Sequence, residues 1–153
     1  MNITVSVEFN KDSIENFTDL EKICYNFALS TGREVLKQIL CAMDDELAMS
    51  RDHARYRNKG LRKTCIKSIL GEVEFDRRVY IDNEAATEAP QCVHLLDEEL
   101  GIEKTGLFSP GVCELITKSI CESSYRAVSR QVTEMTGQSI STQGVWNVVQ
   151  QGR

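Results

Sequence analysis

The sequence predicts an α+β fold that is mainly helical, with a small β-hairpin or three-stranded unit in the middle and a carboxyl-terminal helix-turn-helix. Three observations support this fold class. Apolar residues recur at helical spacing before residue 50, apolar and polar residues alternate after Gly71, and three capped helical patterns follow Ser109. We therefore divide the chain into a helical region (1–50), a basic arm with a small β unit and an acidic loop (51–104), and a helix-turn-helix unit (105–153).

The first region has helical periodicity from about Asp12 to Met49. One apolar stripe comprises Phe17, Leu20, Cys24 and Phe27, and a second comprises Leu36, Ile39, Leu40, Met43 and Leu47. Between them lies the segment 30–32, Ser-Thr-Gly, in which glycine weakens a helix and serine or threonine can cap a new one. The pattern fits either two helices or one kinked helix, and these amphipathic helices could drive dimerisation.

The second region begins with a strongly basic segment. The chain has a formal net charge of −5, but residues 51–80 contain nine basic and four acidic side chains, a local net charge of +5. This asymmetry predicts a surface that binds a polyanion. Because residues 51–63 offer few apolar side chains to bury, we expect a solvated arm or loop there. The candidate phosphate contacts are Arg55, Arg57, Lys59, Arg62 and Lys63.

A β-hairpin is predicted next, formed by residues 64–70 and 73–81, with Gly71 at the first position of a type II′ turn. One face of its second strand would carry Val73, Phe75, Val79 and Ile81. Residues 82–103 hold seven acidic side chains and no lysine or arginine, which predicts an acidic loop and then a short third strand over 92–96. The adjacent carboxylates at 97–99 would point in different directions, so we assign them no catalytic role.

Three helices are predicted in the last region. Ser109 and then Pro110 begin the first helix, Ser123 or Ser124 caps the second, and Ser141 caps the third. Gly137 is the predicted left-handed end of the second helix. The buried stripes would comprise Val112, Leu115, Ile116 and Ile120, then Val128, Val132 and Met135, then Val145, Trp146, Val148 and Val149. Helix, short turn and capped helix form a helix-turn-helix, although an ordinary three-helix packing unit is an alternative.

In a helix-turn-helix the last helix enters the major groove of double-stranded DNA, and its first residues meet base edges. Thr142, Gln143 and Asn147 would be exposed there. Glutamine and asparagine pair with adenine through two hydrogen bonds, and threonine can contact a thymine methyl group. Arg126 and Arg130 on the preceding helix could contact phosphates, as could Lys118.

Other kinds of site find little support. The six cysteines form no Cys-x-x-Cys pair and lie at no zinc-ligand spacing from His53 or His94, so we expect reduced thiols in a cytoplasmic chain and no metal site. The sequence contains no glycine-rich phosphate loop and no nucleophile elbow. It also contains no apolar run long enough to span a membrane and no signal peptide. We therefore expect no catalytic residue, no cofactor and no membrane partner.

Four blocks of sequence, in this order, carry a family resemblance. They are RYRNKGLRKT (55–64), GEVEFDRRVY (71–80), LLDEELG (95–101), and the group SYRAVS (124–129), TGQSIS (136–141) and VWNVVQ (145–150). Together they resemble the Lre-type family of bacterial insertion-sequence transposases, and the resemblance covers most of the chain.

The resemblance implies DNA binding at transposon ends within a longer enzyme. That enzyme would cut and join strands with acidic residues and divalent metal in an RNase H-like domain beyond Arg153. The family's catalytic carboxylates have no matching positions here, so we expect no activity from this chain alone. The alternative is a protein-interaction module in which the helices before Met49 form a homo-oligomer.

Overall fold

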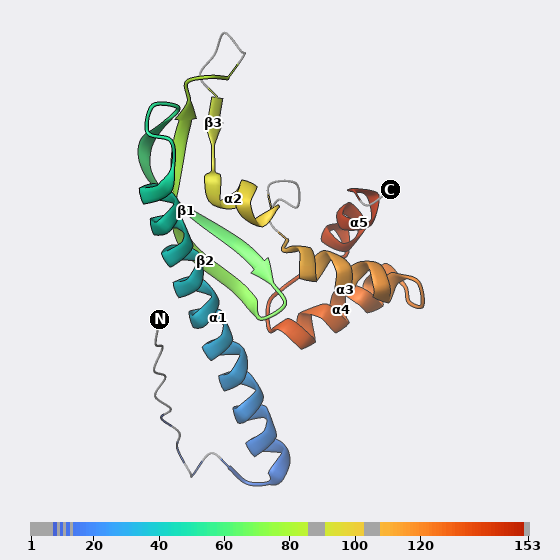
Figure 1. Ribbon diagram of the computed structural model, residues 1–153. Helices are drawn as coiled ribbons and strands as arrows, with labels where there is room; N and C mark the ends of the chain where they lie inside the picture. Colours follow the sequence, from blue (N-terminus) through green and yellow to red (C-terminus); the bar gives the residue numbers. More distant parts are fainter. Residues whose placement is uncertain are drawn as a thin grey trace.

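The computed structural model describes residues 14–85, 91–102 and 108–151, together with residues 8, 10 and 12. In chain order these contain α1 (Phe17–Ser50), β1 (Tyr56–Ser68), β2 (Gly71–Asp82), β3 (Gln91–Val93), α2 (Leu95–Leu100), α3 (Pro110–Ile120), α4 (Tyr125–Thr136) and α5 (Thr142–Gln151). The strands form one antiparallel sheet in the order β1-β2-β3 (Figure 1). The predicted α+β class is confirmed.

The long helix α1 is continuous, so the alternative of two separate helices is wrong. Asn16 caps it by accepting a hydrogen bond from the backbone N–H of Asp19. Gly32 does not end the helix. A Cβ atom at Gly32 would lie 3.1 Å from the side chain of Leu70 in the hairpin turn, so glycine allows this turn to approach α1 closely. Gly32 is therefore explained by tertiary packing against the hairpin, which the local sequence pattern cannot show.

Residues 56–63 belong to β1, so the expectation of an arm or loop is wrong for them. They pair with β2 in an antiparallel ladder from Tyr56–Asp82 to Ser68–Gly71, with a register shift between Asn58 and Leu61. The shift places two residues of β1, at 59 and 60, opposite one residue of β2, and Gly60 has a positive φ of 101°. The ladder gives hydrogen-bond partners to the backbone N–H and C=O groups of this segment, so the strand forms without apolar side chains to bury.

The turn of the hairpin also differs from the prediction. Ser68 pairs with Gly71, so Ile69 and Leu70 are its two central residues. A type II′ turn needs a positive φ at the first central residue, and no described residue other than glycine has one. Gly71, with its positive φ of 117°, therefore lies directly after the two central residues and is not the first of them.

The alternation predicted for β2 holds only in its first half. Val73 and Phe75 are buried, whereas Val79 and Ile81 are half-buried and Tyr80 is completely buried instead. The bulge in β1 lies opposite this second half, and bulges increase the local twist of a sheet. The core of this unit comprises Leu40, Ile66, Val73, Phe75 and Leu96.

The third strand is shorter than predicted. β3 ends at Val93, and the next residues form α2, so Leu95 and Leu96 are helical. Leu96 reaches the core from this helix and is completely buried.

A second core lies inside the unit formed by α3, α4 and α5, and it comprises Val112, Ile116, Val128, Val132, Ile140, Val145 and Val148. The predicted caps are confirmed: Ser109 and Ser124 accept backbone hydrogen bonds, Gly137 is left-handed, and Ser141 accepts from the N–H of Gly144. Two predicted core residues are instead exposed, Met135 by 43% and Trp146 by 45%. Trp146 lies on the outer face of α5, whereas Met135 borders a surface hollow beside Tyr25 and Ile69.

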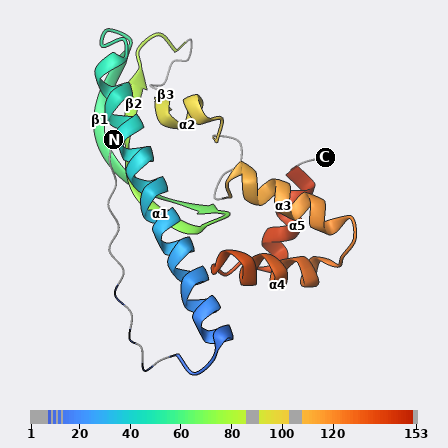
Figure 2. The ribbon, with the colours of Figure 1, turned by 60° about the horizontal axis from the view of Figure 1, so that its bottom comes forward.

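The tip of the β1–β2 hairpin joins the two units, and Figure 2 shows α3, α4 and α5 gathered beside it. Gln138 Nε2 donates a hydrogen bond to the carbonyl of Ser68 (2.7 Å), and Lys67 Nζ donates to the carbonyl of Ser139 (2.5 Å). From α1, the Tyr25 hydroxyl donates to the carbonyl of Met135 (2.5 Å). The turn between α4 and α5 is thus held by the hairpin. Among the described helices, none combines the length and apolarity needed to cross a membrane.

Candidate nucleic-acid interface

The three-helix unit brings two groups of predicted site residues together. Arg126 and Arg130 on α4 and Thr142 at the start of α5 line one open surface hollow of about 460 Å³. The capped start of α4 at Ser124 places both arginines in the first two turns, four residues apart and therefore on the same side of the helix. Both arginines are exposed, and neither forms an ion pair with another described residue. This hollow therefore combines two cationic side chains with the first residue of the next helix.

The outer face of α5 carries the other predicted residues. Thr142, Gln143 and Asn147 are exposed, whereas Val145 and Val148 are buried, so packing determines which side of α5 faces outward. Gln143 Nε2 donates a hydrogen bond to Asn147 Oδ1 at 3.0 Å, which places the two amides side by side. Because α5 contains no charged residue, an anionic partner meets no repulsion from the helix itself.

Hydrogen bonds within the α4–α5 turn fix the start of α5. Ser129 Oγ donates to the carbonyl of Ile140 (2.6 Å), and the N–H of Ile140 donates to Thr133 Oγ1 (3.1 Å). The side chain of Ile140 is buried in the helical core. Gly144 lies close to Phe108, since a Cβ atom there would be 3.2 Å from the phenylalanine ring. Two sets of contacts therefore fix the orientation of α5: the hydrogen bonds at Ile140 hold its start, and Phe108 packs closely against Gly144.

The basic strand forms a second, separate surface. β1 lies at one edge of the sheet, and its residues from Arg57 to Lys63 are all exposed. Arg57, Lys59 and Arg62 form no ion pair with any residue in the described part of the chain. These three side chains can therefore meet an anion without first breaking such a contact.

Arg55 and Lys63 differ from them because each already has a carboxylate partner. The Arg55 guanidinium donates two hydrogen bonds to Asp82, at 3.0 and 2.8 Å, and lies 4.8 Å from the centre of the Tyr56 ring. This hydrogen bonding lowers the pKa of Asp82 below its ordinary value. Lys63 Nζ lies 2.7 Å from Glu74, and that hydrogen bond raises the pKa of the lysine and lowers the pKa of the glutamate.

The positive charge counted along residues 51–80 is partly neutralised inside the fold. Arg77 pairs with Asp97, whose carboxylate is largely buried. Arg78 pairs with Asp44 and Asp45, both at 2.7 Å, and Asp44 also accepts the backbone N–H of Arg78. The aspartate partners lie far away in sequence, so a count of local charges missed them. The basic surface is therefore narrower than the sequence suggested.

The two surfaces are separated along β1. Lys67 contacts the α4–α5 turn through Ser139, and Arg62 and Arg57 lie five and ten residues earlier on the same strand. At roughly 3.3 Å per residue along a strand, these spacings are about 17 and 33 Å. A single ligand that contacts both surfaces must therefore be elongated.

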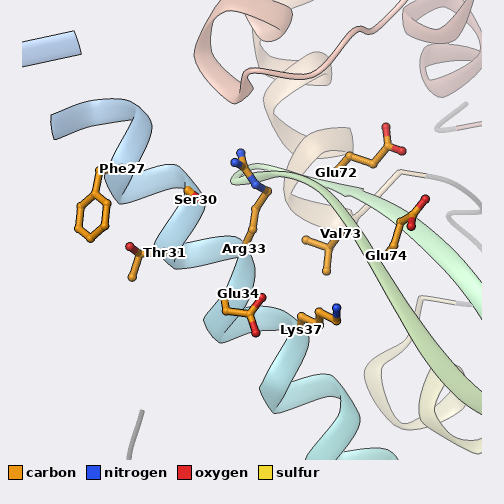
Figure 3. A pocket seen from close by; sticks show the side chains of 9 residues that line it. All are labelled: Phe27, Ser30, Thr31, Arg33, Glu34, Lys37, Glu72, Val73 and Glu74. Atoms are coloured by element: carbon orange, nitrogen blue, oxygen red, sulfur yellow. The ribbon is translucent and has the colours of Figure 1, made fainter. Parts of the chain in front are cut away.

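A larger hollow of about 530 Å³ lies between α1 and β2 (Figure 3). It is lined by side chains of both charges, and Figure 3 shows Arg33 reaching from α1 towards the hairpin, where it donates a hydrogen bond to the carbonyl of Leu70 (3.1 Å). None of the predicted site residues lines this hollow. In the described part of the chain, no group of three or more His, Cys, Asp or Glu side chains is placed to hold a metal ion.

The fold and the candidate site define an α+β protein in which a basic β-hairpin is joined to a unit of three helices. The chain belongs to the uncharacterised protein family UPF0236, whose family model matches residues 11–152. No curated protein and no solved structure matches the chain.

Proposed function

We propose that this chain binds double-stranded DNA and is the DNA-recognition part of an insertion-sequence transposase that acts at transposon ends. The observation that best supports this function is the hollow shared by Arg126, Arg130 and Thr142, beside the exposed amides of Gln143 and Asn147. In this proposal α4 and α5 act as a helix-turn-helix. The two arginines bind phosphates, while α5 enters the major groove and presents the amides to adenine.

The exposed strand β1 adds a second phosphate-binding surface through Arg57, Lys59 and Arg62. Arg62 and Arg57 lie roughly 17 and 33 Å from Lys67 along β1, which is about half a turn and one turn of B-form DNA at roughly 34–36 Å per turn. In this proposal an elongated duplex that meets α5 also reaches the basic strand. The overall charge of −5 would limit non-specific attraction, so these local cations carry the electrostatic part of binding.

The transposase part of the proposal rests on the sequence blocks that resemble the Lre-type family. These blocks coincide with β1, β2, α2 and the region from α4 to α5, and β1, α4 and α5 are the elements that build the two surfaces. The divalent metal of that family acts on its RNase H-like domain, and we propose no residue of this chain as a metal ligand or catalytic group.

Self-association is a second candidate function, and a separate observation favours it. The first half of α1 exposes the apolar side chains of Phe17 (72%), Leu20 (38%) and Tyr25 (49%). Exposed apolar side chains on one element are typical of surfaces that bind another protein. A homo-oligomer formed through α1 would leave α5 and β1 accessible, so the two functions are compatible.

DNA binding can be tested by selecting a duplex from a random-sequence pool and measuring its affinity by fluorescence anisotropy. The measurement is repeated at about 50 and 200 mM salt, because each phosphate contact contributes about one unit to the slope of log affinity against log salt. We expect Arg126→Ala and Arg130→Ala each to weaken binding and lower this slope. Lys22→Ala, which removes a positive charge from α1, is the matched control and should change neither.

A duplex that fails to bind, or an affinity that does not fall with salt in the unchanged protein, would contradict the proposal. Equal effects of the control and the two arginine variants would show that only net charge matters. Sedimentation of a Leu20→Asp variant tests self-association, which should be lost while DNA binding is retained.

A further inference from the structure

The single tryptophan of the chain lies on the outer face of α5. Trp146 is 45% exposed, although its sequence neighbour Val145 and the nearby Val148 are buried. A tryptophan side chain can bury roughly 150–250 Å² of surface, so this indole leaves a large apolar area in water. Such exposure is unusual for a tryptophan in a free domain and is typical of a contact surface.

The neighbours of Trp146 on this face are the proposed base-reading residues. It follows Thr142 by four residues and Gln143 by three, which places all three on one side of the helix. The hydrogen bond between Gln143 and Asn147 runs along the same side. The indole therefore lies among the residues that we propose to meet base edges.

We propose that Trp146 is a base-contacting residue that packs against a thymine methyl group in the major groove, beside an adenine bound by Gln143 or Asn147. The inference rests on the proposed DNA-binding function and extends it, because it predicts a preference for A·T pairs at this position. Thymine is the only base that presents a methyl group in the major groove, and apolar side chains recognise it there.

The surroundings of Trp146 favour DNA over a protein partner. The other exposed residues on this face of α5 are polar, namely Thr142, Gln143, Asn147 and Gln150. The buried core of a protein interface is usually more apolar than the rest of the surface and depleted of charged residues. The adjacent hollow instead carries Arg126 and Arg130, whose charges are complementary to phosphates.

Because the chain has only one tryptophan, tryptophan fluorescence, excited at a wavelength that the four tyrosines do not absorb, reports on this position alone. In a titration with the selected duplex, we expect the emission of Trp146 to change and to saturate at the same DNA concentration as the anisotropy. Trp146→Ala should weaken binding about 5- to 100-fold, as expected for one base contact. Leu100→Ala, which removes an exposed apolar side chain from α2, is the control and should leave the affinity unchanged.

Replacing thymines of the duplex by uracil, which lacks the methyl group, completes the test. One such replacement should weaken binding to the unchanged protein but should have no further effect on Trp146→Ala. If DNA binds but the emission is unchanged and no uracil replacement depends on Trp146, this inference is wrong and the DNA-binding function stands. If Trp146→Ala abolishes self-association and leaves DNA affinity unchanged, the residue belongs to a protein interface. If no duplex binds, the proposed function itself fails.

Discussion

The contact between the hairpin and the helical unit can be tested at Gly71. Its φ of 117° is a conformation that residues with a side chain rarely adopt. A Cβ atom there would lie 2.8 Å from the guanidinium of Arg33, which can move, and 3.1 Å from the backbone carbonyl oxygen of Thr136, which cannot. The substitution Gly71→Ala should therefore destabilise the fold in two ways. It strains the backbone, and it pushes the hairpin tip away from the end of α4.

The size of each effect can be estimated separately. Holding alanine in such a backbone conformation costs roughly 1–3 kcal/mol. Overpacking a close contact adds roughly 1–3 kcal/mol, because the neighbouring atom is backbone and cannot rotate away. We therefore expect Gly71→Ala to lower the free energy of unfolding by roughly 2–6 kcal/mol in total, a large part of the typical 5–15 kcal/mol.

Gly60 provides a matched control for the backbone effect. Its φ of 101° is also positive, but a Cβ atom there would have nothing within 4 Å. Gly60→Ala should thus lower the free energy of unfolding by only the backbone part, roughly 1–3 kcal/mol. Both variants are compared by urea denaturation followed by circular dichroism. Equal losses in the two variants would refute the close contacts of the hairpin tip with Arg33 and with the end of α4.

Three further predictions concern individual side chains. Asp82→Asn should be less stable than the unchanged protein at pH 7, because its lowered pKa means that the ionised Asp82 stabilises the fold at pH values above its unfolded pKa of about 4. This contribution is lost as the pH falls through the folded pKa, so a stability gap in urea denaturation that does not narrow as the pH is lowered from 7 would contradict this reasoning. Burial raises the pKa of the Cys65 thiol to about 11, so an alkylating reagent at pH 8 should modify Cys65 far more slowly than exposed Cys24. Mass spectrometry measures the two rates, and similar rates would contradict the raised pKa of Cys65. Asp44→Ala leaves Arg78 without its buried partner, so it should lower the free energy of unfolding by about 2–4 kcal/mol in the same denaturation assay. A loss within about 0.5 kcal/mol, which is typical of a surface substitution, would disprove the structural role of Asp44.

The sequence by itself determined the features that depend on a few neighbouring residues. Ser109, Ser124 and Ser141 begin helices because their hydroxyl groups accept hydrogen bonds from free backbone N–H groups three residues later. Gly137 ends α4 because glycine adopts the left-handed conformation without strain. These interactions are local, so the printed order of residues was sufficient to predict them. Apart from Trp146, the residues proposed to contact DNA also came from the sequence, and they remain predictions.

The tertiary structure decided which side of each element is covered, because burial depends on segments that are distant in sequence. Trp146 belongs to an apolar pattern, but α3 and α4 pack against Val145 and Val148 and leave the indole outside. Arg78 adds to the local positive charge, but Asp44 of α1 neutralises it. The sequence alone placed the candidate DNA contacts on two segments. Folding decided which of their charges stay accessible, because the carboxylates that neutralise some of them come from segments distant in sequence. Folding also joined the two segments at the hairpin tip.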